Sequence, residues 1–213
     1  DPFRFYCLRE VSFGQDGMVS EEGFKSRYNT ELANELGNLV SRTTSMIGKY
    51  RGGAVPAPPA GRAAADSPLA AEAAGMADIA RGQLEEMELS NALDTIWVFV
   101  RRLNRYVEEQ APWKQAKEEA AALAAAGDDP QRVAAARAPL DGTLWDLAEG
   151  LRLLTVVLHP FIPATTASMR VRLGLEPEPD ASAGPAWSEA TWGLLPAGLV
   201  VAAGAPLFPR IEE

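Results

Sequence analysis

TELANELGNLVSRTTSMIGKY, residues 30–50, carries the clearest structural signal in this chain. One stripe of mainly apolar residues recurs every three or four positions, which is the spacing of a single face of an α-helix. The stripe consists of Leu32, Leu36, Leu39, Thr43, Met46, Ile47 and Tyr50. Gly52 and Gly53 follow it and are suited to end a helix. The stretch therefore predicts an amphipathic helix that packs into a larger core.

Downstream of this helix the same spacing returns several times, separated by prolines and glycines. We predict helices over residues 69–87, 90–110, 112–126, 130–158 with a possible bend at Pro139, and 164–173. Pro112 is well placed as the first residue of its helix, because proline suits the first turn. Residues 51–68 are rich in Pro, Gly and Ala and predict a loop. The chain is thus expected to be all-α, an antiparallel helix bundle with an extended C-terminal tail.

Upstream, residues 1–19 hold a group of aromatic side chains followed by the turn signal Gly14-Gln15-Asp16-Gly17. The aromatic residues are Phe3, Phe5, Tyr6 and Phe13. We predict an irregular, apolar N-terminal segment that packs on another part of the protein. If that part is missing, its aromatics are exposed and the chain should self-associate. Ser20 then predicts a helix start, because a hydroxyl caps the first turn and acidic residues follow it.

Composition limits the class of protein. The 213 residues are 47% hydrophobic and 23% charged, which is ordinary for a globular chain. No apolar run reaches the roughly 18 residues that span a bilayer, so no membrane partner is expected. Cys7 is the only cysteine, which excludes an internal disulfide and favours a reducing compartment. The net charge of −9 argues against nucleic acid, yet residues 95–117 hold five cations and two anions.

Three stretches, in this order and spacing, resemble methionyl-tRNA synthetases. They are FRFYCLRE with FGQDG (residues 3–10 and 13–17), NTELANELGNLVSR (29–42) and NRYVEEQAPW (104–113). The tail PLFPRI, residues 206–211, is also similar to the end of the family's common core. The resemblance covers essentially the whole chain. Neither ATP-binding signature of the family, His-Ile-Gly-His or Lys-Met-Ser-Lys-Ser, occurs here.

The resemblance implies a C-terminal part of a class I synthetase. Residues 1–27 would be the remainder of the stem-contact fold, 28–175 the helical anticodon-binding domain, and 176–213 a tail that packs back on the bundle. Its partners would be the anticodon loop of tRNA-Met and the N-terminal catalytic domain, with no DNA. No catalytic residue, metal or cofactor is expected in this fragment, which should be inactive alone. The full-length parent would be a cytoplasmic methionine–tRNA ligase that uses ATP and methionine.

The resemblance also implies that Asn38 and Arg42 read the first anticodon base. The two residues are four positions apart, so they share one flank of the predicted helix, beside its apolar stripe. Arginine carries only donors. Cytosine offers two neighbouring acceptors, N3 and O2, whereas uracil carries a hydrogen on N3. A buried polar mismatch of this kind costs about 1–3 kcal/mol, so the pair suits the cytosine of a CAU anticodon.

Trp113 is the third residue that the resemblance assigns to the anticodon. Unpaired loop bases stack on aromatic rings, each stack being worth about 1–3 kcal/mol. Pro112 would fix the approach of the ring, because proline restricts φ. The alternative is that Trp113 packs one helix end onto the next. Cations nearby could contact the tRNA backbone or form a solvated helix face; they are Arg101, Arg102, Arg105, Lys114 and Lys117.

Other residues predict structure rather than a site. Trp97 and Trp145 have core spacing, Asn104 lies close to an apolar stripe, Cys7 is expected to be buried, and His159 is expected at a helix end. The apolar residues 199–201 argue against contact between the tail and tRNA.

Two other functions stay open. One is the equivalent domain of another class I synthetase, against which Asn38, Arg42 and Trp113 argue. The other is a helical protein-interaction module, which the acidic charge would suit. Such a module should not shift the mobility of tRNA, and its binding should not depend on Trp113.

Overall fold

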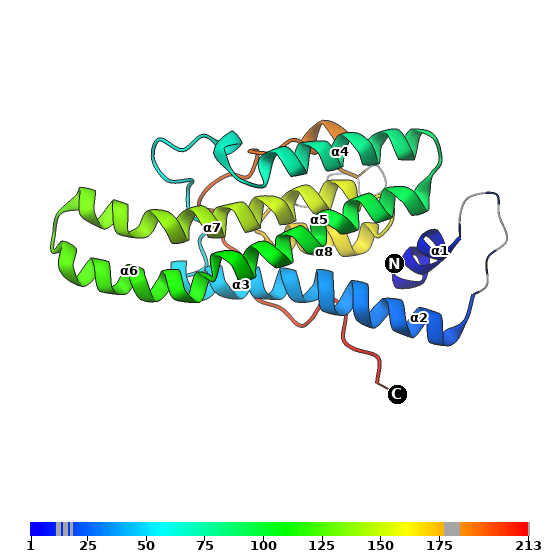
Figure 1. Cartoon of the computed structure of the whole chain (residues 1–213). Coiled ribbons are helices and arrows are strands. Elements are labelled where there is room, and N and C mark those ends of the chain that lie inside the picture. Colours follow the sequence, from blue (N-terminus) through cyan, green and yellow to red (C-terminus); the bar gives the residue numbers. More distant parts are fainter. Residues whose placement is uncertain (12–13, 15–16, 18, 177–183, 213) are drawn as a thin grey trace.

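The computed structural model describes residues 1–11, 14, 17, 19–176 and 184–212. Within these ranges the chain folds as an elongated bundle of helices (Figure 1). No strand occurs among the described residues, and a single antiparallel bridge joins Ala54 to Val200. The prediction of an all-α bundle is confirmed. None of the helices in the described ranges is long and apolar enough to cross a membrane.

One long helix forms an edge of the bundle. It consists of α2 (Glu21–Arg27), the π-helical segment η1 (Tyr28–Gly37) and α3 (Asn38–Arg51). Ser20 caps it as predicted, since its Oγ accepts a hydrogen bond of 3.0 Å from the amide of Gly23. Gly52 ends it with a φ of +61°. The boundary placed after residue 27 therefore lies inside a continuous helix, and the domain assignment stays a prediction.

The remaining helices form two antiparallel pairs and a short closing helix. The first pair is α4 (Ala70–Glu85) and α5 (Leu89–Gln110), and the second is α6 (Pro112–Ala126) and α7 (Pro130–Val157). The last helix is α8 (Pro163–Arg172). In Figure 1 the α6–α7 hairpin projects beyond the other helices. The helices agree closely with those predicted, because the helical period and the prolines that start α6 and α7 are strong local signals.

The core lies where α5 and α7 meet the long helix. Trp97 and Trp145 are buried, as their spacing predicted. A polar network is also buried there: Tyr106 Oη donates a hydrogen bond of 2.8 Å to Oδ2 of Asp146, which also receives Arg62 Nη2 at 2.8 Å. Because Asp146 is fully buried, these donors offset the cost of removing its carboxyl group from water.

The prediction of an irregular N-terminal segment is wrong for residues 2–10, which form α1 (Pro2–Glu10). Phe5 is buried, with its ring centroid 4.8 Å from that of Trp97, whereas Phe3 is 62% exposed. The segment thus packs on this bundle, and its aromatics are only partly exposed. Cys7 is half-buried and not fully buried as predicted. Phe13, Gln15 and Asp16 lie outside the described residues.

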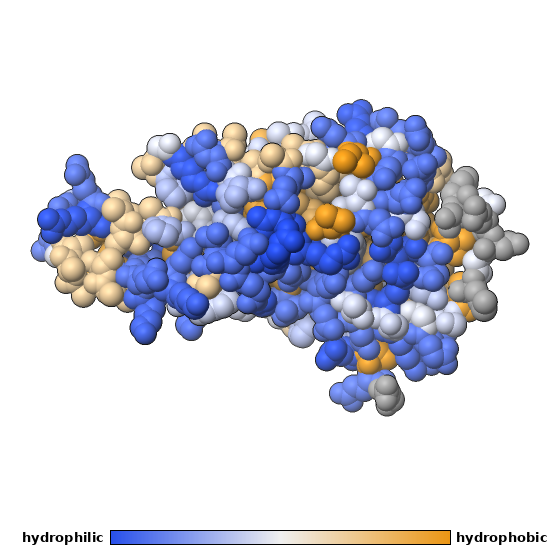
Figure 2. All heavy atoms as spheres, viewed as in Figure 1, coloured by the Kyte–Doolittle hydropathy of each residue, from blue (hydrophilic) through white to orange (hydrophobic). Residues whose placement is uncertain are grey.

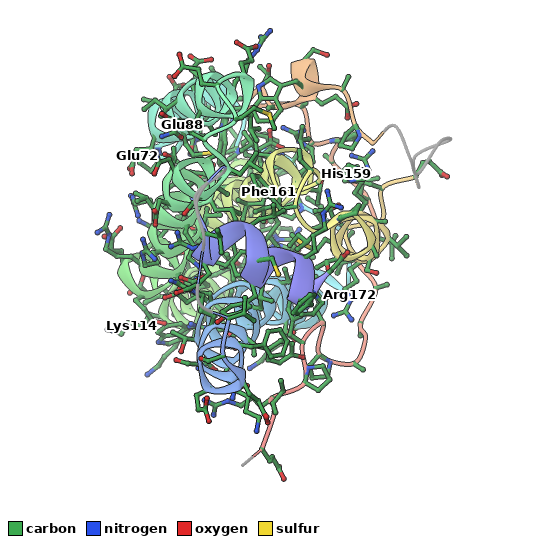
Figure 3. The ribbon with its side chains drawn as sticks, turned by 90° about the vertical axis from the view of Figure 1, so that its right-hand side faces the viewer. Glu72, Glu88, Lys114, His159, Phe161 and Arg172 are labelled. Carbon is green, nitrogen blue, oxygen red and sulfur yellow. The ribbon has the colours of Figure 1, made fainter. Side chains whose placement is uncertain are left out.

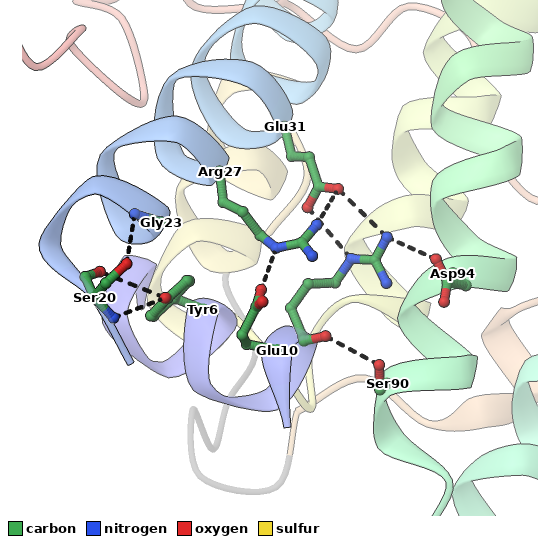
Figure 4. Close-up of polar contacts among 9 residues, drawn as sticks. Tyr6, Glu10, Ser20, Gly23, Arg27, Glu31, Ser90 and Asp94 are labelled. Atoms are coloured by element: carbon green, nitrogen blue, oxygen red, sulfur yellow. Dashed lines mark hydrogen bonds and ion pairs between the residues drawn. The ribbon is translucent and has the colours of Figure 1, made fainter. Parts of the chain in front are cut away.

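Ion pairs join α1 to its neighbours (Figure 4). Arg9 pairs with Glu31 of η1 at 3.3 Å and with Asp94 of α5 at 2.6 Å. Arg27 pairs with both Glu10 and Glu31, at 2.7 and 3.0 Å. Arg9 and the Glu31 carboxylate are largely buried, so this network fixes α1 on the bundle.

The C-terminal tail packs back across the bundle. The buried carboxylate of Glu149 on α7 accepts hydrogen bonds from three successive amides of the tail, those of residues 193–195, at 2.5–3.1 Å. Arg152 donates to both oxygens of the same carboxylate, at 2.7 and 2.8 Å. Further along, Tyr28 Oη donates to the carbonyl of Pro209 at 2.8 Å. The tail is therefore held by α7 at one point and by η1 at another.

Candidate functional site

Asn38 and Arg42 lie on the exposed side of α3, where the sequence placed them. Asn38 is exposed at the first position of α3, and Arg42 follows one turn later with its side chain 32% exposed. The π-helical segment ends just before them, since the amide of Asn38 is bonded to the carbonyl of Ala33, five residues back. π-Helical turns are rare and are frequent at functional sites.

The guanidinium of Arg42 is directed towards α5. Its Nη2 donates to Oε1 of Glu108 at 2.6 Å, and the carboxylate of Glu108 is itself exposed. A charge-assisted bond of this kind orients the guanidinium without burying it. Sequence reasoning did not single out Glu108. Its position could have been found, because residues 101, 104 and 108 follow helical spacing along one edge of α5.

Trp113 is held by a sharp junction between α5 and α6. Ala111 alone connects the two helices, and it adopts a φ of +44°, which is uncommon for a residue with a side chain. Pro112 begins α6 and is buried. Trp113 follows with 43% of its surface exposed. Trp113 is thus partly exposed, and both its stacking role and the alternative that it packs one helix end onto the next stay predictions.

Two ion pairs set α3 alongside this junction. Arg42 of α3 contacts Glu108 near the end of α5, and Arg51 at the end of α3 contacts Glu119 of α6 at 2.7 Å. Trp113 lies between Glu108 and Glu119 in the chain, at the start of α6, so it belongs to the segment that these two ion pairs join to α3. Trp113, which is distant from Asn38 and Arg42 in sequence, is thereby placed on a helix that an ion pair joins to theirs.

The five candidate cations fall into three groups. Lys114 and Lys117 are exposed on α6 and make no ion pair with any described residue. Arg101 and Arg105 are exposed on α5, with Glu35 at 3.8 Å from Arg101 and Glu109 at 3.4 Å from Arg105. The side chain of Arg102 is 11% exposed and lies between Glu72 and Glu109, at 2.8 and 3.1 Å. Around α3 and α5 the face drawn in Figure 2 is mainly hydrophilic.

Asn104 and Glu35 lie next to this surface, where α5 contacts η1. Asn104 Nδ2 donates to the carbonyls of Glu35 and Val100, both at 3.1 Å, so its structural role is confirmed. Burial raises the pKa of the Glu35 carboxyl, and the nearby Arg101 only partly opposes that rise. Asn104 thus ties α5 to η1 one turn before the Arg42–Glu108 contact.

The described side chains show no arrangement suited to metal binding. No group of three or more His, Cys, Asp and Glu residues could hold an ion in these ranges. His159 lies just beyond α7, as predicted, with Nδ1 at 2.9 Å from Oγ1 of Thr166. The candidate site is therefore a surface of hydrogen-bond donors, cations and one partly exposed aromatic ring.

Sequence comparisons show that the chain is similar to one group of enzymes. A family model described as "tRNA synthetases class I (M)" matches residues 1–44. The chain is 40% identical over 214 aligned residues to the methionine–tRNA ligase of Streptomyces coelicolor, covering all of this chain and 37% of the relative. It is 41% identical to methionine–tRNA ligase 1 of Bacillus anthracis, covering 29% of that protein. The chain thus spans less than two fifths of the length of these curated relatives.

Comparison with solved structures finds similarity to the same group of enzymes. The fold matches the apo form of Mycobacterium tuberculosis methionyl-tRNA synthetase with a TM-score of 0.80 and 32% identity, covering all of this chain and 39% of that one. It matches the same synthetase in complex with methionyl-adenylate with a TM-score of 0.78, over 98% of this chain and 37% of that one.

Proposed function

Because this chain belongs over its whole length to the methionyl-tRNA synthetase family, we propose that it is the tRNA-binding part of such an enzyme and reads the CAU anticodon. The parent protein is then a cytoplasmic methionine–tRNA ligase that uses ATP and methionine. The M. tuberculosis relative has been solved in complex with methionyl-adenylate. We assign the chemistry to a catalytic part of the parent protein outside this chain. This chain contributes selection and orientation of the tRNA, and is inactive alone.

The observation that carries the proposal is the side-by-side exposure of Asn38 and Arg42 on α3. Arg42 is half-buried and one of its donors is engaged by Glu108, so a base meets the donors that Glu108 leaves free. Its donors suit N3 and O2 of cytosine. Asn38 is exposed one turn away and offers both a donor and an acceptor. Together they form a donor-rich edge that accepts cytosine and disfavours uracil.

Trp113 supplies the stacking surface in this proposal. Trp113 is 43% exposed and follows Pro112 in the first turn of α6, so its indole can offer a surface to an unpaired base. Stacking tolerates any base, so Trp113 contributes affinity, whereas Arg42 contributes selectivity.

The cations that make no ion pair within the described part of the chain are the candidates for contact with the phosphate backbone of the RNA. Lys114 and Lys117 follow Trp113 on α6 and make no ion pair with the described residues, so we assign them to phosphates. Arg101 and Arg105 are exposed and only loosely paired, and they extend the same surface along α5. Arg102 is occupied by Glu72 and Glu109, so we assign it to the packing of α4 on α5.

The domain boundaries belong to the same proposal. Residues 1–27 are the remainder of the stem-contact fold, 28–175 the anticodon-binding domain and 176–213 the tail. Phe3 is strongly exposed beside Phe24, with ring centroids 6.4 Å apart. We assign this exposed aromatic edge to contact with the catalytic part of the parent. It is also the part of the surface through which the isolated chain would self-associate.

The test is the affinity of the 213-residue chain for a fluorescent RNA stem-loop that carries CAU. Trp113→Ala should weaken binding by about tenfold or more, since one stack is worth about 1–3 kcal/mol. Phe3→Ala is the matched control, because it removes an exposed aromatic ring from α1. Equal affinities of Trp113→Ala and Phe3→Ala, with both variants folded, would contradict the proposal.

A further inference from the structure

A polar pocket opens on the other side of α3 from Glu108. Its volume is about 340 Å³, and it is formed by α3, the end of α8 and the tail around residues 201–204. Two cations, Lys49 and Arg172, and three hydroxyl-bearing residues line it, and no described lining residue is acidic. The hydroxyls are those of Ser41, Thr44 and Ser45.

The absence of a carboxylate there is unusual for this chain. Acidic residues outnumber basic ones by 29 to 20, and most of its arginines are paired with Asp or Glu. Three other pockets on the described surface each include at least one carboxylate. Lys49 and Arg172 make no ion pair with any described residue; the ammonium of Lys49 lies 5.3 Å from the centroid of the Tyr50 ring, and Arg172 donates to a backbone carbonyl. Two unneutralised cations that line one pocket favour an anion as its ligand.

Arg172 is held in place by the main chain of the tail. Its Nη2 donates to the carbonyl of Ala205, and its own carbonyl accepts from the amide of Ala202 at 2.9 Å. A side chain at Gly204 would approach the guanidinium to within 3.2–3.5 Å, so the glycine lets Arg172 lie flat against the tail. The cation is therefore preorganised by the tail. The cations and hydroxyls of the pocket come from α3 and the end of α8, so the proposal needs no contact from the apolar tail residues that argue against tRNA binding.

Two hydroxyls in the pocket are free to donate. Ser41 and Ser45 make no side-chain hydrogen bond with the described residues, whereas Thr44 Oγ1 donates to the carbonyl of Val40 at 3.0 Å. Phosphate oxygens accept from Lys, Arg and Ser side chains together. This donor set suits a phosphate better than a carboxylate, because it can engage several oxygens at once.

The pocket continues the surface that carries Asn38 and Arg42. Asn38, Arg42, Ser45 and Lys49 follow one another along the exposed side of α3. Lys49 lies seven residues beyond Arg42, which is roughly 10 Å along the helix. In Figure 3, Lys114 and Arg172 lie on opposite flanks of the bundle, with the long helix between them. A strand of RNA that crosses α3 can thus meet cations on both sides.

We propose that this pocket binds a backbone phosphate of the RNA whose anticodon is read by Asn38 and Arg42. That the ligand is this RNA rests on the proposed function. That the ligand is an anion rests on the charges that line the pocket. A phosphate contact fixes the register of the strand and carries no sequence information. Lys49 and Arg172 are thus positioning residues for RNA, whereas Arg42 discriminates between bases.

The test compares the double variant Lys49→Gln/Arg172→Gln with the charge-matched control Lys25→Gln/Arg81→Gln. The control removes two exposed cations from α2 and α4, each paired with a neighbouring glutamate. The pocket variant should bind CAU and UAU stem-loops about tenfold more weakly, with the ratio between them unchanged. The slope of log K against log salt should fall by about 1 relative to the control.

A second measurement probes the pocket without RNA. Inorganic phosphate should shift the amide resonances of Gly48 and Gly204 in the unaltered chain, and these shifts should vanish in the pocket variant. Phosphate shifts combined with control-like RNA affinity would mean a pocket for free anions and overturn the RNA assignment. No shifts would overturn the anion site itself. If neither stem-loop binds the unaltered chain, the proposed function fails and the RNA assignment with it, while the phosphate titration still decides whether the pocket takes an anion.

Discussion

The guanidinium of Arg42 and the carboxylate of Glu108 are 2.6 Å apart, and the pair joins α3 to α5 at an exposed edge. Glu108 therefore occupies a donor of Arg42 that a base would otherwise use. Because the pair is solvent-exposed, it contributes no more than about 1 kcal/mol to stability. Its larger effect is on the availability of Arg42.

This relationship predicts that Glu108→Gln increases RNA affinity. Removing the charge frees Arg42 and lowers the repulsion of phosphates, so the dissociation constant for a CAU stem-loop should fall by about threefold, on the scale of one exposed pair. Glu85→Gln is a suitable control, since it also removes a glutamate that pairs with an arginine at 2.9 Å on the surface. Weaker binding by Glu108→Gln would mean that the carboxylate is needed to orient Arg42.

A second prediction concerns Tyr106→Phe. The hydroxyl that it removes donates to the buried Asp146, leaving one fewer donor for a carboxyl group that water does not reach. Unfolding by urea should show a loss of about 1–3 kcal/mol. The pKa of Tyr106 is raised by burial and by Asp146, so the hydroxyl remains a donor across the physiological range of pH. An unchanged midpoint would indicate that Arg62 alone satisfies Asp146.

A third prediction concerns the tail. The carboxylate of Glu149 accepts hydrogen bonds from two donors of Arg152 and from three backbone amides of the tail. Glu149→Gln replaces it with a neutral side chain that carries only one acceptor oxygen. Breaking a buried pair in this way costs about 3–5 kcal/mol. Limited proteolysis should then cut near residues 193–195 before the helices unfold. Cleavage elsewhere first, with the tail still protected, would show that Glu149 is not its main anchor.

A fourth prediction follows from Glu35, whose pKa is raised by burial. The folded state holds this proton more tightly than the unfolded chain, so the contribution of Glu35 to stability is greatest at low pH. That contribution is lost as the pH rises from the unfolded pKa through the folded one. Glu35→Gln removes this pH dependence. Its free energy of unfolding, relative to that of the unaltered chain, should therefore increase from acidic to neutral pH. The gain should stay below about 1 kcal/mol, because the side chain is 27% exposed and screened. Urea unfolding at both pH values measures it, and a gain that is the same at both would contradict the prediction.

Helix positions were predictable because they depend on local signals. The start of α6 at Pro112 and the cap at Ser20 follow from single residues whose chemistry suits a helix terminus. Trp97 and Trp145 were predictable as core residues from their spacing. The helix α1 was missed because its buried residues do not repeat over enough turns to give a periodic stripe, and it is stabilised by contacts with η1 and α5.

Contacts between residues that are distant in the chain could not be predicted from the sequence. Nothing near Glu149 indicates that its partners lie more than forty residues away in the tail. Arg102 was grouped with Arg101 and Arg105 as a candidate phosphate contact, because spacing alone does not reveal that Glu72 of another helix reaches it. The pocket around Lys49 and Arg172 was missed for the same reason, since it forms only when α8 and the tail meet α3.

The central claim is that this chain distinguishes the first base of a CAU anticodon. The most direct measurement is the ratio of its affinities for two stem-loops that differ only in that base, CAU and UAU, at fixed moderate salt. We predict a preference for CAU of about tenfold or more, corresponding to about 1.4 kcal/mol, and its loss in Arg42→Gln. Equal binding of the two loops by the folded, unaltered chain would contradict the assignment of anticodon reading to Asn38 and Arg42.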